Sequence, residues 1–312
     1  MRITVTGGSG FIGANLCSLL VQRGHRVLVL DDLSTSSASN LEGIDVTLLV
    51  ASVLDLDVVR DAVADADAVV HLAARGSVPR SVADPIGCHA ANTTGTMHVL
   101  EAARANGAHV VAASSSSVYG GGPELPKHEA MPTRARSPYA ASKVALEALI
   151  QGYQGSFELD ALAFRFFNVY GPLQAAGHAY AAVIPTWIDA ALRGRPLPIH
   201  SDGRQTRDFT YVSTVCEVLV DAVERRVTHD RPVNLALGNR VSLRELAALI
   251  EASLGQPVER EHLPARAGDV TDSQADPTTL RHLFPGVRPV AVATGISSTI
   301  DWFRHQQVGA TS

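Results

Sequence analysis

The stretch TGGSGFIG, residues 6–13, decides the fold of this chain. It follows the apolar run RITVT and precedes an apolar helical pattern over residues 12–22, so its glycines lie in a turn between a strand and a helix. Gly7, Gly10 and Gly13 allow a tight turn and a close approach of the backbone to a pyrophosphate, which the amino end of the helix attracts. We therefore predict a dinucleotide site at this turn.

The same strand–helix rhythm continues through the first half of the chain. Expected strands cover residues 2–7, 26–31, 46–51, 68–74, 109–115 and 161–169, and expected helices cover residues 12–22, 58–64, 92–106 and 138–153. Apolar strands that alternate with helices indicate a parallel sheet covered on both faces. After residues 168–172 the rhythm breaks, and helices are expected at 183–193 and 242–254. We predict an α/β fold: a Rossmann doubly wound domain over residues 1–170 and a smaller α/β substrate lobe over 171–312, parts of which return to the first domain.

Composition excludes several classes of function. The 312 residues are 46% hydrophobic and carry a formal net charge of −5, with no basic run, so we expect no nucleic-acid partner. We also expect no membrane association, because the chain enters a strand at once and contains no long apolar stretch. The three cysteines lie far apart and the histidines show no ligand spacing, which favours a reducing compartment and no metal. We predict a cytoplasmic protein.

Asp31 ends the second expected strand. A carboxylate at this place accepts hydrogen bonds from a ribose 2′-hydroxyl and repels a 2′-phosphate. The sequence therefore favours NAD over NADP as the cofactor.

A second motif, YAASK at residues 139–143, lies early in an expected helix, so Tyr139 and Lys143 are one turn apart on the same face. A free phenol is a poor base at neutral pH, but a nearby ammonium favours the phenolate. A strand that ends in the serines of residues 114–117 precedes this helix. Alone, Tyr139 could be a packing residue and Lys143 a surface charge. Together with the glycine turn, the motifs predict alcohol oxidation or carbonyl reduction with a nicotinamide cofactor.

Over nearly its whole length the chain resembles the extended short-chain dehydrogenase/reductases of the nucleotide-sugar epimerase family. It resembles most the branch of UDP-N-acetylglucosamine/UDP-glucose 4-epimerases. The resemblance rests on ten segments in order: TGGSGFIG (6–13), DDLST (31–35), HLAARGSVPRS (71–81), NTTGTMHVLEAAR (92–104), SSSSVYG (114–120), SPYAASK (137–143), RFFNVYGP (165–172), YAAVIP (180–185), DGRQTRDFTYV (202–212) and RAGDVTDSQAD (266–276).

The resemblance implies a catalytic serine, Ser115, hydrogen-bonded to the reacting sugar hydroxyl, with Tyr139 as the base and Lys143 also holding the nicotinamide ribose. Asn92 matches a family asparagine near the active site, although holding its helix in place is an equal alternative. Ser52 stands where relatives often carry an aspartate that contacts the adenine, a contact that Asp55 could take over. The implied cofactor-binding residues are Gly7, Gly10, Phe11, Ile12, Gly13, Asp31, Ser52, Val53, Leu72, Ala73, Ala74, Tyr139 and Lys143.

In this family arginines of the second lobe grip the substrate diphosphate, since guanidinium groups suit bidentate phosphate contacts. Without the resemblance, an exposed ion pair of Arg207 and Asp208 is the lesser alternative. The implied substrate-binding residues are Ser77, Ser116, Ser117, Asn168, Val183, Arg207, Arg266 and Ser273. The resemblance also implies a homodimer, formed through a four-helix bundle of the expected helices 92–106 and 138–153.

The implied reaction is the reversible C4 epimerisation of a UDP-hexose through a 4-keto intermediate, with tightly bound NAD. Ser116 and Ser117 replace the Asp-Glu pair of dehydratases, and Ala175 replaces an arginine of glucuronate-handling relatives. Ser273 replaces a bulky tyrosine of glucose-restricted epimerases, which leaves room for a 2-acetamido group. We therefore expect turnover of UDP-GlcNAc/UDP-GalNAc and of UDP-Glc/UDP-Gal. Alternatives are a UDP-glucuronate 4-epimerase, a nucleotide-sugar 4,6-dehydratase, an NAD-linked reductase and a non-catalytic dinucleotide sensor.

Overall fold

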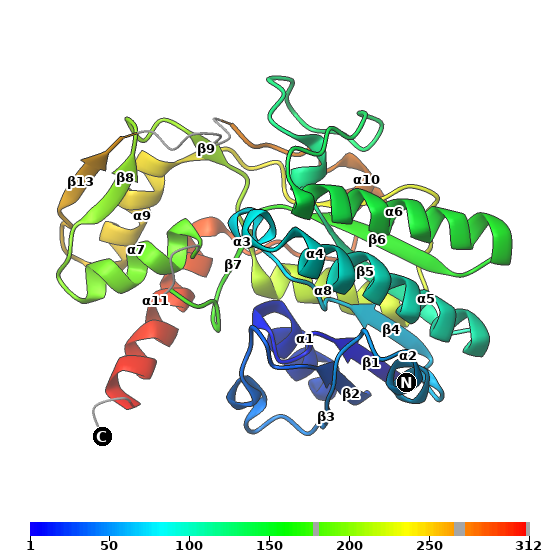
Figure 1. The fold of residues 1–312 in the computed structure, drawn as a ribbon. Helices are drawn as coiled ribbons and strands as arrows, with labels where there is room; N and C mark the ends of the chain where they lie inside the picture. Colours follow the sequence, from blue (N-terminus) through cyan, green and yellow to red (C-terminus); the bar gives the residue numbers. More distant parts are fainter. Residues whose placement is uncertain (177–180, 265–271, 310–312) are drawn as a thin grey trace.

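A seven-stranded parallel sheet forms the centre of the computed structural model, which describes residues 1–176, 181–264 and 272–309 (Figure 1). Its spatial order is β3-β2-β1-β4-β5-β6-β11, and the first six strands follow the order of doubly wound dinucleotide folds. The predicted α/β fold class is thus confirmed. The strands are β1 (Arg2–Thr6), β2 (Arg26–Asp31), β3 (Thr47–Val50), β4 (Ala68–His71), β5 (His109–Ser115), β6 (Ala161–Phe166) and β11 (Val233–Leu235).

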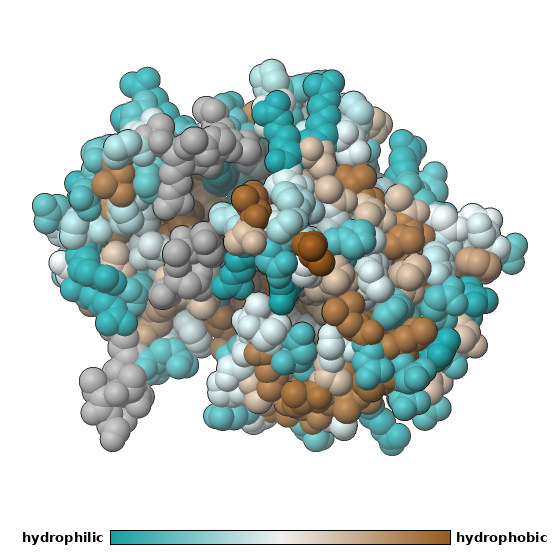
Figure 2. All heavy atoms as spheres, in the orientation of Figure 1, coloured by the Kyte–Doolittle hydropathy of each residue, from teal (hydrophilic) through white to brown (hydrophobic). Residues whose placement is uncertain are grey.

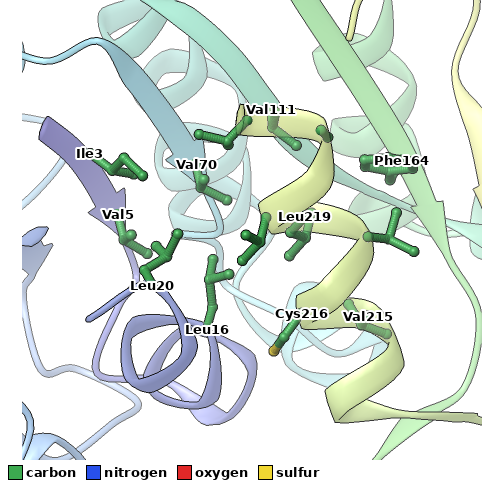
Figure 3. Close-up of a cluster of buried hydrophobic side chains, with 14 of the residues drawn as sticks. Ile3, Val5, Leu16, Leu20, Val70, Val111, Phe164, Val215, Cys216 and Leu219 are labelled. Atoms are coloured by element: carbon green, nitrogen blue, oxygen red, sulfur yellow. The ribbon is translucent and has the colours of Figure 1, made fainter. Parts of the chain in front are cut away.

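Helices cover both faces of the sheet. On one face, α1 (Phe11–Gln22) and α8 (Val212–Glu224) pack side by side, and Figure 3 shows their apolar residues meeting those of the strands. On the other face lie α2 (Leu56–Val63), α5 (Gly95–Asn106) and α6 (Pro138–Phe157). Successive side chains of a strand point to opposite faces of the sheet. In β4, Val70 therefore packs into the core on the α1 and α8 face, and Val69 into the core on the other face.

The second lobe has a core of its own. Helix α11 (Val292–Gly309) packs against α7 (Val183–Leu192) and α9 (Leu243–Leu254), and α7 packs against β8 (Leu197–His200), which pairs in parallel with β13 (Arg260–Leu263). Trp187, Ile250 and Ile300 lie among its buried residues. The expected helices at 183–193 and 242–254 are confirmed to within one residue. Two short strand pairs lie nearby: β7 (Val169–Tyr170) with β10 (Thr210–Tyr211), and β9 (Thr206–Arg207) with β12 (Val241–Ser242).

Some boundaries differ from expectation. The strand expected at 68–74 ends at His71, because its neighbour β1 ends at Thr6, whose carbonyl accepts the last hydrogen bond on that side from the Leu72 N–H at 3.0 Å. The strand expected at 161–169 likewise ends at Phe166, and the helix expected from residue 92 begins as a π-helical segment, Ala90–Thr94. Short elements complete the chain: η1 (Ala38–Leu41), α3 (Val78–Ala83), α4 (Pro85–His89), η3 (Ser116–Tyr119) and α10 (Thr278–Leu283).

None of the helices in the described ranges combines the length and the apolar character that crossing a membrane requires.

Candidate active site

The carboxyl ends of four neighbouring strands gather the cofactor and catalytic segments at one edge of the sheet. In the register of the sheet, Thr6 of β1 lies opposite His71 of β4, His71 opposite Ala112 of β5, and Ser115 of β5 opposite Phe166 of β6. The segments that follow these strands therefore lie in the same spatial order. Ligands of open α/β sheets bind at this edge.

A cavity of about 220 Å³ lies at this edge around the ends of β1, β2 and β4. Eight of the predicted cofactor residues line it: Gly7, Gly10, Asp31, Ser52, Val53, Leu72, Ala73 and Ala74. Phe11, Ile12 and Gly13 form the first turn of α1 next to it. Asp55 caps α2 by accepting a hydrogen bond from the Val58 N–H at 3.3 Å, so Ser52 and not Asp55 lines the cavity.

Two glycines of the turn, Gly7 and Gly13, leave no room for a side chain. Gly7 adopts φ +70°, and a Cβ there would lie 2.6 Å from the backbone nitrogen of Ala73. A Cβ on Gly13 would lie 2.3 Å from the carbonyl oxygen of Gly7. Bare backbone at the amino end of α1 is what a pyrophosphate needs for close approach, so the residues present fit a dinucleotide.

The carboxylate of Asp31 is fixed in the wall of the same cavity. It accepts hydrogen bonds from the backbone N–H groups of Ser9 and Leu33 and from the hydroxyl of Ser36, each at 2.9 Å. A carboxylate held in this way keeps a negative charge where a 2′-phosphate would have to lie, which agrees with NAD as the cofactor.

The predicted catalytic residues meet where β5 and α6 come together. The Ser137 hydroxyl caps α6 by accepting from the Ala140 N–H at 3.1 Å, which fixes the first turn of the helix and with it Tyr139. The Lys143 ammonium donates to the Ala113 carbonyl of β5 at 2.7 Å and lies 5.9 Å from the centre of the Tyr139 ring. Ser115 ends β5, and its side chain hydrogen-bonds to that of Tyr139.

Burial is the main influence on both titrating groups. It raises the pKa of Tyr139, and the hydrogen bond with Ser115 acts in the opposite direction. It lowers the pKa of Lys143 to about 8, while nearby Cys88 and Glu147 raise it. The site therefore holds an ammonium that still carries its charge at neutral pH beside the Tyr139 phenol, and such a charge favours the phenolate.

Asn92 connects α6 to the loop after β4 through side-chain hydrogen bonds. Its side chain is buried, accepts a hydrogen bond from the Arg75 N–H at 2.7 Å and donates to the Ser142 hydroxyl at 2.9 Å. Of the two interpretations offered by the sequence, these contacts are those expected of a residue that holds the helix in place.

An ion pair that the sequence analysis missed lies directly behind Lys143. Glu147, one turn further along α6, accepts two hydrogen bonds from Arg165 of β6, Nε to Oε1 at 2.9 Å and Nη2 to Oε2 at 2.8 Å. The Ser114 hydroxyl donates to the same carboxylate at 2.5 Å, and the Arg165 guanidinium lies 4.6 Å from the centre of the Tyr119 ring. The only sequence signal was an arginine inside the otherwise apolar run FRFF.

His71 is a second missed residue. It is buried at the end of β4, with Nδ1 2.7 Å from the Thr6 hydroxyl and Nε2 3.0 Å from the Thr96 hydroxyl. Burial and the charge of Lys143 lower its pKa to about 3, so it is neutral at physiological pH. The Thr96 hydroxyl in turn donates to the Asn92 carbonyl at 2.6 Å. His71 therefore connects Thr6, at the start of the glycine turn, to Asn92 through Thr96.

A second cavity, of about 290 Å³, lies between the end of β6 and the second lobe. Among the predicted substrate residues it is lined by Asn168, Val183 and Arg207. Arg207 donates through Nη1 to the Thr206 carbonyl at 2.9 Å, and the Ser273 N–H donates to the same carbonyl at 3.1 Å. The structure thus brings these four residues together.

The other predicted substrate residues lie elsewhere. Ser116 and Ser117 form η3, where Ser117 donates through its N–H and its hydroxyl to the Ser115 hydroxyl at 3.2 and 3.0 Å. Ser77, next to α3, adopts φ +97°, and its buried hydroxyl has no hydrogen-bond partner within the described ranges. Arg266 lies outside the described residues.

Comparison with known proteins gives the same picture over the whole chain. The NAD dependent epimerase/dehydratase family matches residues 3–236. A UDP-glucose 4-epimerase from Mycolicibacterium smegmatis is 38% identical, over 98% of this chain and 99% of its own. Relatives with other activities, including nucleotide-sugar decarboxylases and dehydratases, also match nearly the whole chain.

Solved structures agree closely with this fold. A UDP-N-acetylglucosamine 4-epimerase from Methanobrevibacter ruminantium, in complex with UDP-N-acetylmuramic acid, has a TM-score of 0.93 at 33% identity and covers 98% of both chains. A UDP-glucose 4-epimerase from Thermus thermophilus in complex with NAD has a TM-score of 0.88 at 34% identity, covering 97% of this chain and 99% of that one. With its glycine turn, fixed Asp31 and serine–tyrosine–lysine site, the chain belongs to the NAD dependent epimerase/dehydratase family.

Proposed function

We propose that this protein catalyses the reversible C4 epimerisation of a UDP-hexose with NAD that stays bound through the cycle. The observation that carries the proposal is the position of Ser115, Tyr139 and Lys143. Ser115 is the last residue of β5, and Tyr139 and Lys143 lie in the first two turns of α6. In the sheet, β5 lies between β4 and β6. The cofactor cavity borders the end of β4, and the cavity with Arg207 borders the residues that follow β6. This arrangement is the one expected if the sugar hydroxyl is oxidised at a point between the cofactor and the anchored diphosphate.

The chain supplies the proton transfer and the anchoring. The Tyr139 phenolate takes the proton of the sugar 4-hydroxyl, the Lys143 ammonium stabilises that phenolate, and Ser115 hydrogen-bonds to the sugar oxygen. NAD, which Gly7, Gly10 and Asp31 would hold, would supply a hydride acceptor that is regenerated over the whole cycle. Arg207 holds the diphosphate while the hexose turns to present its other face. Tyr139 then returns the proton, and C4 is inverted.

Three positions favour neutral hexoses, with or without a 2-acetamido group. Ser117 is tied to Ser115 and cannot act as the acid or base that dehydration requires. Ala175 offers no charge to a substrate carboxylate, which disfavours UDP-glucuronate. The Ser273 N–H bonds to the Thr206 carbonyl of β9, and a small side chain at this position would leave space for a 2-acetamido group. We therefore propose UDP-GlcNAc/UDP-GalNAc and UDP-Glc/UDP-Gal as substrates.

The test is a panel of UDP-Glc, UDP-GlcNAc and UDP-GlcA, with GDP and dTDP sugars as controls and products resolved by NMR. Inversion at C4 of the first two without added NAD is the expected result. Product formed in deuterated water should carry no deuterium at C4, because the same hydride returns. Deuterium at C4, or loss of water from the sugar, would contradict the proposal.

We also propose that two copies associate through α5 and α6. Figure 2 shows apolar residues among paler ones over these helices, and Met97 of α5 and Phe157 of α6 are exposed large apolar side chains. The remaining exposed positions of α6 include the small residues Ala141 and Ala148, which allow close helix packing. Analytical ultracentrifugation should show a dimer that Met97→Glu converts to monomer; a wild-type monomer would contradict this.

The three cysteines, Cys17, Cys88 and Cys216, are all free and buried, which agrees with a reducing compartment. We propose the cytoplasm as the location.

A further inference from the structure

Asp208 has no place in the reaction described above, yet it is fully buried. It lies between β9 and β10. Its Oδ2 accepts hydrogen bonds from the backbone N–H groups of Gly238 and Ala275, both at 3.0 Å, and its Oδ1 accepts from the N–H of Asn239 at 3.2 Å. One side chain therefore joins its own segment to two others that are remote in sequence.

The segments that Asp208 joins are those that carry the substrate residues. Arg207 precedes it directly in the chain. Its own carbonyl accepts a hydrogen bond from the Asn168 side chain at 3.1 Å, which fixes the residue that follows β6. Ala275 lies two residues after Ser273, whose N–H bonds to Thr206. The three segments that carry Asn168, Arg207 and Ser273 are thus all connected to Asp208.

The same contacts connect the lobe to the sheet. Gly238 and Asn239 follow β11, the edge strand that pairs with β6. The Asn239 side chain adds a hydrogen bond to the Phe209 carbonyl at 3.3 Å. If the segment around Arg207 moved relative to the catalytic edge, meaning the end of β5 and the first turns of α6, these hydrogen bonds would break. The bonds therefore set the distance between the diphosphate and the reacting hydroxyl.

A carboxylate is the side chain that this position requires. Burial raises the pKa of Asp208 to about 6, against the lowering effect of the backbone hydrogen bonds, so the charge is held at a cost. A carboxylate accepts at both oxygens, whereas an amide of the same shape accepts at one and donates at the other. An asparagine would place its NH₂ against one N–H of Asn239, or against the two N–H groups of Gly238 and Ala275.

We propose that Asp208 is a positioning residue for the nucleotide sugar, whose carboxylate holds the segments of Asn168, Arg207 and Ser273 in register with the catalytic edge. The inference rests on the proposed function, because it concerns the same substrate site. It predicts that substrate binding depends on Asp208 while cofactor binding does not, since no cofactor-cavity residue contacts it in the described part of the chain.

The test compares Asp208→Asn with Asp202→Asn in the NAD-loaded protein. Asp202 is a matched control, because it lies on the same loop but is exposed and pairs with Arg204. The Kd of UDP is measured by calorimetry, KM and kcat with UDP-glucose, and NAD content from the nucleotide released on denaturation. For Asp208→Asn we expect Kd and KM to rise at least tenfold, with NAD content unchanged and a smaller change in kcat. Asp202→Asn should behave like the wild type.

Each outcome is decisive. If the wild type does not bind UDP, the proposed function is wrong and the inference falls with it. If the wild type binds UDP and Asp208→Asn binds it equally well, the positioning role is wrong while the function stands. Loss of NAD together with UDP would show a merely structural role.

If Asp208→Asn fails to fold, hydrogen–deuterium exchange of the wild-type protein replaces it. UDP should slow exchange in residues 236–240 and 272–276 as well as around Arg207. Protection confined to the segment around Arg207 would overturn the inference.

Discussion

The buried pair of Glu147 and Arg165 offers the sharpest test of how this fold supports Lys143, the lysine proposed to be catalytic. Glu147 lies one turn after Lys143 on α6, and both side chains of the ion pair are about 5% exposed. Replacing Glu147 by glutamine removes one charge and leaves the Arg165 guanidinium buried without a counter-charge. Breaking a buried ion pair in this way costs about 3–5 kcal/mol of unfolding free energy.

The same substitution should change the chemistry through Lys143. Burial lowers the pKa of Lys143 to about 8, and the negative charge of Glu147 is one of the groups that raise it. In Glu147→Gln the pKa of Lys143 therefore falls further. Since the ammonium is the active form, activity is lost as pH rises through this pKa, and the alkaline limb of the kcat profile should move to lower pH.

Two measurements separate these effects. Urea unfolding gives the change in stability, and kcat measured between pH 6 and pH 9 gives the position of the alkaline limb. The double variant Glu147→Gln/Arg165→Met removes both charges, so it should recover part of the stability lost by the single variant. A single variant with an unchanged alkaline limb would refute the electrostatic link to Lys143. A loss of less than about 1 kcal/mol would refute the claim that the substitution leaves the Arg165 guanidinium buried without a counter-charge.

Three further predictions follow from the site. In the wild type, kcat should fall as pH rises through about 8, because Lys143 loses its proton there, and Lys143→Met should abolish both that limb and most activity at neutral pH. Gly13→Ala should prevent NAD retention, since its Cβ would lie 2.3 Å from the Gly7 carbonyl, whereas Gly10→Ala, with 3.2 Å to the same atom, should retain part of it; the NAD content of the purified proteins measures this. Ser273→Tyr should lower turnover of UDP-GlcNAc at least tenfold and spare UDP-Glc, and equal rates on both would contradict the proposed size selection.

The sequence predicted the first six strands of the sheet because each is a short apolar run between turn residues, and these patterns are local. It missed β11, whose three residues Val233–Leu235 are too few to show a period. What makes them a strand is their pairing with β6, where Val233 lies opposite Phe164, and this contact joins residues far apart in the chain. The helix α8 was also missed, although its apolar residues do show helical spacing.

The same division applies to the site. The glycine turn and the Tyr139–Lys143 spacing could be predicted, because a turn and one helical step are defined by adjacent residues. The roles of His71, Glu147 and Asp208 could not, because each depends on burial and on partners from other elements. His71 and Asp208 lie inside motifs that point to the cofactor and the substrate, and Glu147 lies in the expected helix 138–153, outside every motif.

The structure also gives a reason why relatives with different activities can be similar to this chain over nearly its whole length. Ser115, Tyr139 and Lys143 are set by β5 and α6, which are anchored to each other through Ala113 and backed by the Glu147–Arg165 pair. The residues proposed to hold the sugar stand instead on short segments that are connected by backbone hydrogen bonds to Asp208. Substitutions on those segments can therefore alter which sugar is held, and for how long, without moving the groups that transfer the proton. On this argument, a change of sugar preference should be obtainable at Ser273 with the pH profile of kcat left unchanged, whereas any change at Glu147 should alter that profile for every substrate.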